Sequence, residues 1–303
     1  MPDLNIPPLL PGDKIGLVSP AGPVKPAQVK EGMRLLEELG YRCIPGQHAF
    51  ANAGIVSAPR EDRLSDLHGF LQDPDVRAIW ALRGGYGSMQ LLAGLDYELL
   101  QHAPRWLIGF SDLTAFQWAL FNRIKQPSLS GLALTLQVHK ENPYLQAGLR
   151  ILSGEKRSVS AEELQQDTPR VITAGTAKGT LIGGTLTMIA ALCGTSYFRQ
   201  RRNLVLVLED VNEPLYRIDR LFEQLDMLGF WKQVKAVVVG RFLYGEGELD
   251  VIPNLLARLE ARTPVVAGFP YGHYSGSFPI PFGVRVELQT DPFFMRWRSP
   301  VTR

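Results

Sequence analysis

The chain has 303 residues, of which 45% are hydrophobic, and its 32 basic and 30 acidic residues give a net charge of +2. A chain of this length can bury a sizeable core and favours two domains over one. The nearly balanced charge, without a basic run or an acidic tail, argues against nucleic acid or a membrane surface as a partner.

The start of the chain lacks the basic and apolar regions of a secretory signal, and no stretch approaches the roughly 18 apolar residues of a membrane span. Cys43 and Cys193 form neither a disulfide framework nor a C-x-x-C motif. We therefore expect a cytoplasmic protein with structural, buried cysteines. The sequence contains no H-E-x-x-H motif, metal-spaced His/Cys cluster or EF-hand loop, so it predicts no metal and no cofactor.

The first part of the chain alternates short apolar runs, which predict strands, with segments of helical periodicity. In chain order these predict strand 14–19, helix 26–39, strand 41–44, helix 61–72, strand 76–82, helix 88–95, strand 105–110 and helix 113–121. Such alternation implies right-handed βαβ units and a parallel sheet. Ligands of such sheets bind outside the carboxyl ends of the strands.

Residues 154–179 are polar and show little apolar periodicity, which predicts a connection between two domains. We expect an N-terminal domain at 1–153, a linker at 154–176 and a C-terminal domain at 177–303. The patterns of the last part predict a helix ending near residue 192, strand 203–208, helix 214–228, strand 236–239 and antiparallel strands within 284–297.

Ser111 lies at the turn between a predicted strand and a predicted helix, in the segment GFSDLT at 109–114. A sharp strand-to-helix turn exposes one side chain and points free N–H groups of the helix at its target. The match to G-x-S-x-G is partial, because Leu113 stands in place of the last glycine. A nucleophile and a simple helix cap by Ser111 or Asp112 both fit this pattern.

A serine nucleophile needs a base, usually a histidine oriented by a carboxylate. Among five histidines we favour His273, because Gly272 and Gly276 flank it and permit close backbone approach. The others are His48, His102 and His139 in polar loops and His68 in a helical pattern. For the carboxylate we favour Glu209, which ends a buried strand. Glu213 is the rival, although a place in a first helical turn explains it.

The segment RGGYG at 83–87 places three glycines after a predicted strand. Such a turn exposes consecutive N–H groups, which bind an anion or form half of an oxyanion hole. We expect the N–H of Gly85 to act with that of Asp112. Arg83, Gly84 and Tyr86 are candidates for holding a substrate carboxylate. A tight turn without a ligand is the alternative.

Five segments in this order resemble the serine LD-carboxypeptidase family: PGDKIGLVSPAG at 11–22, RGGYG at 83–87, GFSDLT at 109–114, LEDVNEP at 208–214 and GH at 272–273. That family includes murein tetrapeptide carboxypeptidases and microcin C self-immunity peptidases. The resemblance implies an α/β fold: an N-terminal flavodoxin-like parallel sheet with helices on both faces, and a smaller C-terminal α/β domain. It also implies a homodimer.

By the same resemblance, Ser111, His273 and Glu209 form a catalytic triad, and the amides of Gly85 and Asp112 form the oxyanion hole. Two departures concern the pocket. The family usually has Gly-Gly-Asn-Leu where this chain has Thr185 as the third residue, and often has Gly-Pro where Leu132 follows a glycine.

The expected activity is hydrolysis of the L,D bond of murein tetrapeptide, which releases D-alanine from meso-diaminopimelate during cell-wall recycling. The Thr185 departure keeps open a microcin-immunity type of peptidase that acts on aminoacyl or peptidyl nucleotides. A non-catalytic protein that binds a small ligand is a third possibility, with Ser111 as a cap.

Overall fold

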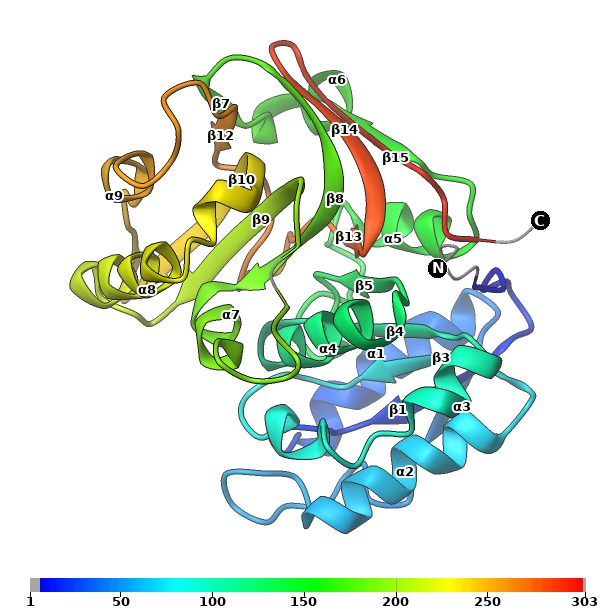
Figure 1. Ribbon diagram of the computed structural model, residues 1–303. Coiled ribbons are helices and arrows are strands. Elements are labelled where there is room, and N and C mark those ends of the chain that lie inside the picture. The colour runs from blue at the N-terminus through cyan, green and yellow to red at the C-terminus, as the bar shows by residue number, and fades with distance from the viewer. Residues whose placement is uncertain (1–5, 200, 302–303) are drawn as a thin grey trace. The chain divides into compact units, whose positions relative to one another are not determined.

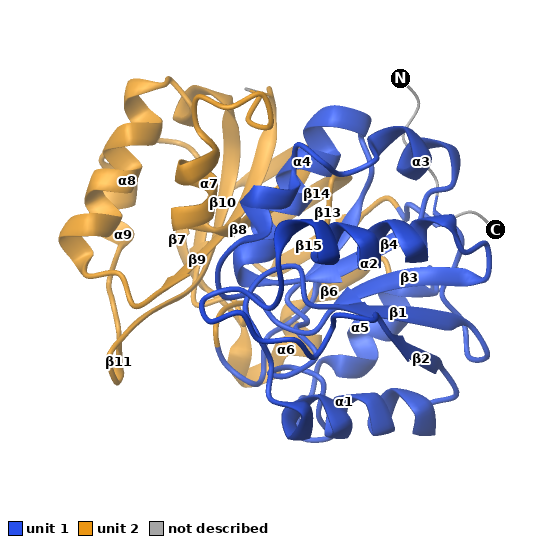
Figure 2. Cartoon of the chain, turned by 90° about the horizontal axis from the view of Figure 1, so that it is seen from below, with its two compact units in different colours: residues 1–156, 274–281, 299–303 blue, residues 157–273, 282–298 orange. Residues whose placement is uncertain are grey.

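The computed structural model describes residues 6–199 and 201–301 (Figure 1). The chain divides into two compact units, coloured separately in Figure 2. The first unit comprises residues 1–156, 274–281 and 299–303, and the second comprises 157–273 and 282–298.

The first unit contains a six-stranded sheet and its helices. In chain order its elements are β1 (Lys14–Val18), α1 (Pro26–Glu38), β2 (Arg42–Pro45), α2 (Arg60–Gln72), β3 (Val76–Ala81), the 3-10 helix η1 (Ser88–Leu91), α3 (Tyr97–His102), β4 (Trp106–Gly109), the 3-10 helix η2 (Ser111–Leu113), α4 (Thr114–Ile124), β5 (Ser128–Ser130), α5 (Leu145–Leu152) and β13 (Ile280–Phe282).

The strand order of this sheet is β13-β5-β4-β3-β1-β2, and β1 to β5 pair in parallel. The order 2-1-3-4-5 is that of flavodoxin-like sheets, in which ligands bind at the carboxyl ends of the strands. Strands β3 and β4 are almost entirely buried because helices cover both faces (Figure 1). The predicted α/β fold class is confirmed for this unit.

The second unit is built on a nine-stranded mixed sheet. In chain order its elements are β6 (Ser158–Ser160), α6 (Ala161–Leu164), η3 (Gln165–Asp167), β7 (Arg170–Thr173), β8 (Thr176–Thr185), α7 (Leu186–Leu192), β9 (Leu204–Val211), α8 (Leu215–Met227), η4 (Trp231–Gln233), β10 (Val234–Tyr244), β11 (Gly247–Glu248), α9 (Ile252–Leu256), β12 (Val265–Ala267), β14 (Val284–Thr290) and β15 (Phe293–Trp297).

The centre of this sheet is parallel, with β8, β9, β10 and β12 as neighbours. Antiparallel strands extend it on both sides, and β11 pairs with β10. The predicted antiparallel strands within 284–297 are confirmed as β14 and β15. Strand β9 is buried at its first seven residues, which is why its sequence is apolar on both faces.

The structure departs from the sequence-based expectations in several elements. Residues 158–173, expected to lie in a linker, form β6, α6 and β7 and belong to the second unit, while residues 274–281 and 299–303 return to the first. The helix expected at 88–95 is only the 3-10 helix η1, because turns follow residue 91. Short polar or edge segments such as β6 carry too few residues for periodicity to show.

The two cysteines differ in burial. Cys43 is buried, as expected, and burial together with the charge of Glu37 raises its thiol pKa to about 12. Cys193 is only half-buried, and burial raises its pKa to about 11. Both thiols are therefore protonated at neutral pH and poor nucleophiles.

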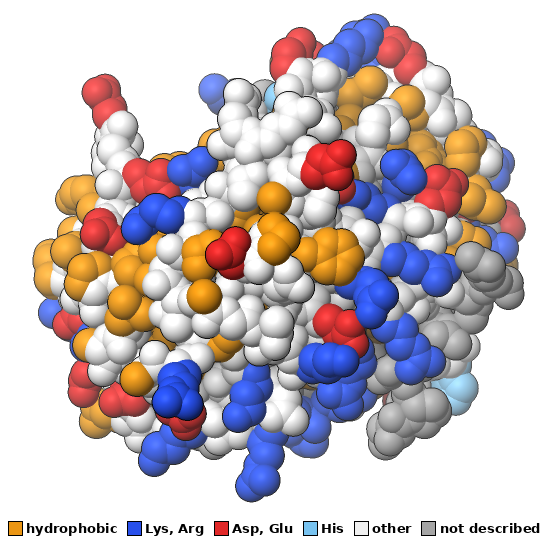
Figure 3. Space-filling view, turned by 90° about the horizontal axis from the view of Figure 1, so that it is seen from above, with side chains coloured by type: hydrophobic (Ala, Val, Ile, Leu, Met, Phe, Trp, Pro, Cys, Tyr) orange, Lys and Arg blue, Asp and Glu red, His pale blue; other side chains and the backbone are white. Residues whose placement is uncertain are grey.

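Among the described residues, no helix is long and apolar enough to cross a membrane. On the face drawn in Figure 3, acidic side chains lie among the basic ones, and the apolar side chains form small groups. This mixed surface agrees with the nearly balanced charge of the sequence.

Candidate active site

Ser111 has a strained backbone. It follows β4 and opens η2, and its φ is +65°, a left-handed conformation that is uncommon for a non-glycine residue. Strain of this kind persists only where the surrounding structure enforces it, and it clusters at functional sites. A strand, a strained serine and then a helix are the backbone arrangement expected of a nucleophile elbow.

The alternative of a helix cap does not account for Asp112. Helix α4 begins after Leu113, which makes no side-chain cap. The buried Asp112 carboxylate instead accepts a hydrogen bond from the Ser88 N–H over 2.8 Å, and the Ser88 hydroxyl donates to the Asp112 carbonyl over 2.7 Å. Burial raises the pKa of Asp112, against the Ser88 hydrogen bonds and the charge of Arg63. These contacts fix the elbow to η1.

The glycine-rich turn after β3 lies directly against Ser111. A Cβ placed on Gly84 would lie 2.7 Å from the Ser111 Cβ and 3.0 Å from its Oγ, so no larger residue fits without displacing the serine. Gly85 has a φ of +109°, which favours glycine. In residues 6–199 and 201–301, the N–H groups of Gly85 and Asp112 donate to no acceptor. Both donors are thus available for an oxyanion beside Ser111.

A buried arginine joins the loops around the elbow. Arg63 of α2 is 3% exposed and donates to the carbonyls of Pro20 and Gly87 over 2.8 and 3.0 Å and to Gln90 Oε1 over 2.6 Å. It therefore ties the loop after β1 to the loop after β3. Sequence reasoning missed this residue, although a charge beside Leu64, on the apolar face of its helix, was a signal.

The two proposed substrate-holding side chains of this turn are exposed. Arg83 is exposed and donates to the carbonyl of Pro23 over 3.1 Å, and the Tyr86 side chain is 55% exposed. Leu132, the second departure from the family pattern, is fully buried, and its carbonyl accepts from the Trp80 indole over 3.0 Å. Its side chain thus belongs to the core of the first unit.

In the second unit, the buried Glu209 pairs with the partly buried His273. The His273 Nδ1 lies 2.7 Å from Glu209 Oε2, and the Glu209 side chain has no exposed surface. Because a carboxylate only accepts hydrogen bonds, this contact places the imidazole proton on Nδ1 and leaves Nε2 as an acceptor. An oriented imidazole that presents Nε2 as an acceptor is the arrangement expected of a general base.

The electrostatics of the pair favour a basic imidazole. Burial of His273 acts against the charged ring, but the charge and hydrogen bond of Glu209 and the charge of Asp210 outweigh it, so the pKa of His273 is raised. Burial and the neighbouring Glu209 raise the pKa of Asp210 to about 6. The raised His273 pKa makes it a stronger base than a free histidine.

Glu209 has a second hydrogen-bond partner. The Thr185 hydroxyl donates to Glu209 Oε1 over 2.5 Å, and the two residues are direct partners in the parallel pairing of β8 with β9. The strands approach closely here, since a Cβ on Gly183 would lie 1.8 Å from the Val207 carbonyl oxygen. Thr185, expected to alter a substrate pocket, therefore contacts the carboxylate of the pair.

The other candidates have different partners. The remaining histidines contact Asp66 (His48, 3.0 Å), the Asp96 N–H (His68), the Glu98 carbonyl (His102) and Glu141 (His139). His48 also faces a buried carboxylate, but its Nε2 lies 3.8 Å from Asp62, a second acid. The rival carboxylate Glu213 forms an ion pair with Arg217 at 3.4 Å.

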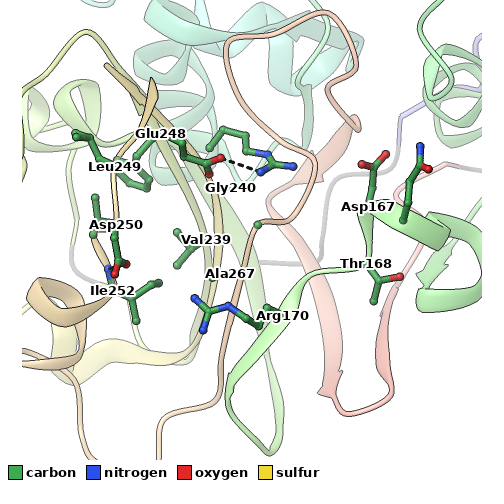
Figure 4. A pocket seen from close by; sticks show the side chains of 15 residues that line it. Asp167, Thr168, Arg170, Val239, Gly240, Glu248, Leu249, Asp250, Ile252 and Ala267 are labelled. Atoms are coloured by element: carbon green, nitrogen blue, oxygen red, sulfur yellow. Dashed lines mark hydrogen bonds and ion pairs between the residues drawn. The ribbon is translucent and has the colours of Figure 1, made fainter. Parts of the chain in front are cut away.

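A separate cavity of about 420 Å³ lies in the second unit, at the carboxyl ends of β10 and β12. Figure 4 shows acidic side chains (Asp167, Glu248, Asp250) and Arg170 around it, with the Arg241–Glu248 ion pair at 2.9 Å. Glu209 and His273 are not among the described residues that line it. Groups of three or more potential metal ligands do not occur within the described ranges.

Comparison with known proteins identifies relatives of this chain. Residues 15–131 match the LD-carboxypeptidase N-terminal domain and residues 178–288 match the LD-carboxypeptidase C-terminal domain. The murein tetrapeptide carboxypeptidase of Pseudomonas aeruginosa is 33% identical over 305 residues, which cover 94% of this chain and 95% of that protein.

Solved structures share the fold. A muramoyltetrapeptide carboxypeptidase from Oxalobacter formigenes is 27% identical, with a TM-score of 0.77 over 94% of this chain and 97% of that chain. The microcin C7 self-immunity protein MccF in complex with glutamyl sulfamoyl guanosine has a TM-score of 0.89 at 20% identity, over 99% and 100% of the two chains. The chain belongs to the LD-carboxypeptidase family of serine-type carboxypeptidases, peptidase family S66.

Proposed function

We propose that this enzyme hydrolyses the L,D peptide bond between meso-diaminopimelate and the terminal D-alanine of murein tetrapeptide, in cell-wall recycling. The observation that carries the mechanism is the strained Ser111 at the elbow, with the free amides of Gly85 and Asp112 beside it. The relatives named murein tetrapeptide carboxypeptidase and muramoyltetrapeptide carboxypeptidase support the choice of substrate.

In the proposed mechanism, Ser111 of the first unit acts with His273 and Glu209 of the second. The Ser111 Oγ attacks the carbonyl carbon of diaminopimelate while His273 Nε2 accepts its proton, and Glu209 stabilises the imidazolium. The Gly85 and Asp112 amides bind the oxyanion of the tetrahedral intermediate.

The intermediate collapses when the C–N bond breaks and His273 returns the proton to the leaving amine of D-alanine. Water, deprotonated by His273, then attacks the acyl ester. The bond between the acyl carbon and Ser111 Oγ breaks, His273 returns the proton to Oγ, and the shortened peptide leaves with a new carboxylate. The proton transfers involve only Ser111, the substrate, water and the His273 imidazole, so the proposed reaction needs no cofactor. Arg83, Gly84 and Tyr86 are proposed to hold the terminal carboxylate of the substrate, because Arg83 and Tyr86 are exposed in the turn beside Ser111.

A second candidate keeps the triad and changes the substrate to an aminoacyl or peptidyl nucleotide. The fold similarity to the MccF complex favours it. In the third, non-catalytic possibility Ser111 would be a cap, and the commitment of Asp112 to Ser88 and the positive φ of Ser111 speak against that.

The deciding experiment measures D-alanine released from L-Ala-γ-D-Glu-meso-diaminopimelate-D-Ala, beside hydrolysis of a peptidyl-adenylate analogue. We expect release from the tetrapeptide and none from the matched peptide that ends in L-alanine. Hydrolysis of the nucleotide analogue alone would move the second candidate to first place, and hydrolysis of neither substrate by folded protein would remove both.

We also propose that the protein is cytoplasmic, and that it forms a homodimer, as its resemblance to the family implies. Light scattering after size-exclusion chromatography should give about twice the chain mass of 33.7 kDa. A mass equal to one chain at all concentrations would reject the dimer.

A further inference from the structure

Thr185 makes a side-chain hydrogen bond that is unusual for a residue at the start of a helix. It is the N-cap residue of α7, a place where a threonine hydroxyl usually accepts a hydrogen bond from the first helical turn. In this chain Thr185 makes no side-chain cap, and its hydroxyl donates to Glu209 Oε1 over 2.5 Å instead.

The capping function is carried by the neighbouring acid. Asp210 Oδ2 accepts from the backbone N–H and the hydroxyl of Thr187, both over 2.8 Å, and Asp210 Oδ1 accepts from the Val211 N–H. The carboxylate of Asp210 thus satisfies the free N–H of the first turn of α7. The two adjacent acids of β9 therefore have different partners. Asp210 caps helix α7, and Glu209 is hydrogen-bonded to Thr185 and His273.

We propose that Thr185 is a positioning residue that fixes the Glu209 carboxylate, so that Oε2 faces the imidazole of His273. The inference rests on the triad of the proposed function. Glu209 is fully buried, and its two oxygens are bound by one hydroxyl donor and one imidazole N–H. A carboxylate held at both oxygens cannot rotate away from the ring, and its charge is shared between two hydrogen bonds.

The first test replaces Thr185 with valine, which keeps the branched shape and removes the hydroxyl. We expect kcat for D-alanine release to fall about tenfold with KM little changed, because the hydrogen bond acts through Glu209 and not on bound substrate. Thr185→Ser, which retains a hydroxyl, should restore most of the activity.

The matched control is Thr187→Val, which removes the same kind of hydroxyl from the other acid, Asp210. It should lower the melting temperature and leave kcat close to that of the wild type. Equal losses of kcat in both variants would show that the effect is general destabilisation and would overturn the proposal.

The second readout does not depend on the substrate. NMR titration of the His273 imidazole, assigned with His273→Asn, should give a higher pKa in Thr185→Val than in the wild type. Without the Thr185 donor, the negative charge of Glu209 concentrates on its contact with the ring. The charged groups that act on His273 in this unit are Glu209 and Asp210, and Thr187→Val controls for the second.

The outcomes separate the two proposals. A shifted His273 titration in an enzyme that releases no D-alanine would retain the role of Thr185 and reject the proposed substrate. An active wild type with an unchanged or lower His273 pKa in Thr185→Val would reject the role of Thr185 alone. If Thr185→Val does not fold, the His273 pKa is measured in Thr185→Ala by the same NMR titration, and the same outcomes apply.

Discussion

Ser111 is held in place by backbone geometry, whereas Glu209 and His273 are held by side-chain hydrogen bonds. In the first unit, a φ of +65° and the absence of a side chain at Gly84 set the serine. In the second unit, the register of β8 with β9 and two short hydrogen bonds set the carboxylate. A nucleophile requires exposure at a sharp turn, while an orienting carboxylate requires burial, so the two solutions differ.

The largest effect is expected when the proposed nucleophile of the first unit is removed. Ser111→Ala should lower kcat for D-alanine release roughly 10⁴- to 10⁶-fold, because no other group forms the acyl ester. The circular dichroism spectrum and melting temperature should stay close to those of the wild type. Full activity of the variant would show that Ser111 is not the nucleophile.

The role of Glu209 in the second unit is tested by removing the charge of its carboxylate. Glu209→Gln should lower kcat about 10³- to 10⁴-fold, since the imidazole loses its orienting acceptor and the stabilisation of its charged form. The matched control is Glu213→Gln. Within the described residues, the Glu213 carboxylate forms an ion pair with Arg217 alone. A larger loss in Glu213→Gln than in Glu209→Gln would reverse the assignment.

A substitution of Gly84 tests whether backbone geometry holds Ser111 in place. Gly84→Ala places a Cβ 2.7 Å from the Ser111 Cβ and 3.0 Å from the Phe110 carbonyl oxygen, so the elbow must shift. We expect about a 10²-fold loss of kcat, as for a small misplacement of a reacting group, and a loss of unfolding free energy of about 1–3 kcal/mol.

Gly69→Ala is the control for this variant, because Gly69 is exposed in α2 and a Cβ there meets nothing within 4 Å. It should retain full activity and gain up to about 1 kcal/mol of stability from its better helix propensity. Unchanged kinetics in Gly84→Ala would contradict the close approach of the turn to the serine.

The smallest expected effect is on the pH dependence of activity, and it concerns His273 in the second unit. The acidic limb of kcat/KM should have its midpoint above 6.5, the ordinary pKa of histidine, because Glu209 and Asp210 outweigh burial and raise the pKa of His273. Activity should rise as pH rises through that value, since the base must be neutral. In Glu209→Gln the midpoint should move to lower pH.

The same shift has an opposite consequence for stability. A histidine whose pKa is raised in the fold stabilises it fully below the unfolded pKa of 6.5, and this contribution is lost as pH rises through the folded value. The melting temperature should therefore fall over that interval in the wild type, and fall less in Glu209→Gln. An equal decrease in both proteins would place the raised pKa elsewhere.

What the sequence could predict follows from the range of each interaction. The strand before Ser111 and the helix after it are local, so apolar runs and periodicity located them, and the elbow followed. The parallel order of β1 to β5 likewise follows from the alternation of strands and helices. The start of β9 was predicted within one residue, although the strand continues to Val211.

What could not be predicted depends on contacts between distant segments. The hydroxyl of Thr185 meets Glu209 only because β8 and β9 pair in one register, and Arg63 meets two loops that lie apart in the sequence. The strands β6 and β7 are short and polar or exposed, and they form because the edges of the sheet accept them. No periodicity of the chain carries this information.

The central claim is that Ser111 of the first unit and the His273–Glu209 pair of the second act as one triad. The most direct test is covalent labelling by a fluorophosphonate, with the modified residue mapped by mass spectrometry and the rate compared between the wild type and His273→Asn. We predict rapid labelling at Ser111 in the wild type and at least a 10³-fold slower rate in the variant. Labelling of Ser111 at equal rates in both proteins would contradict the account.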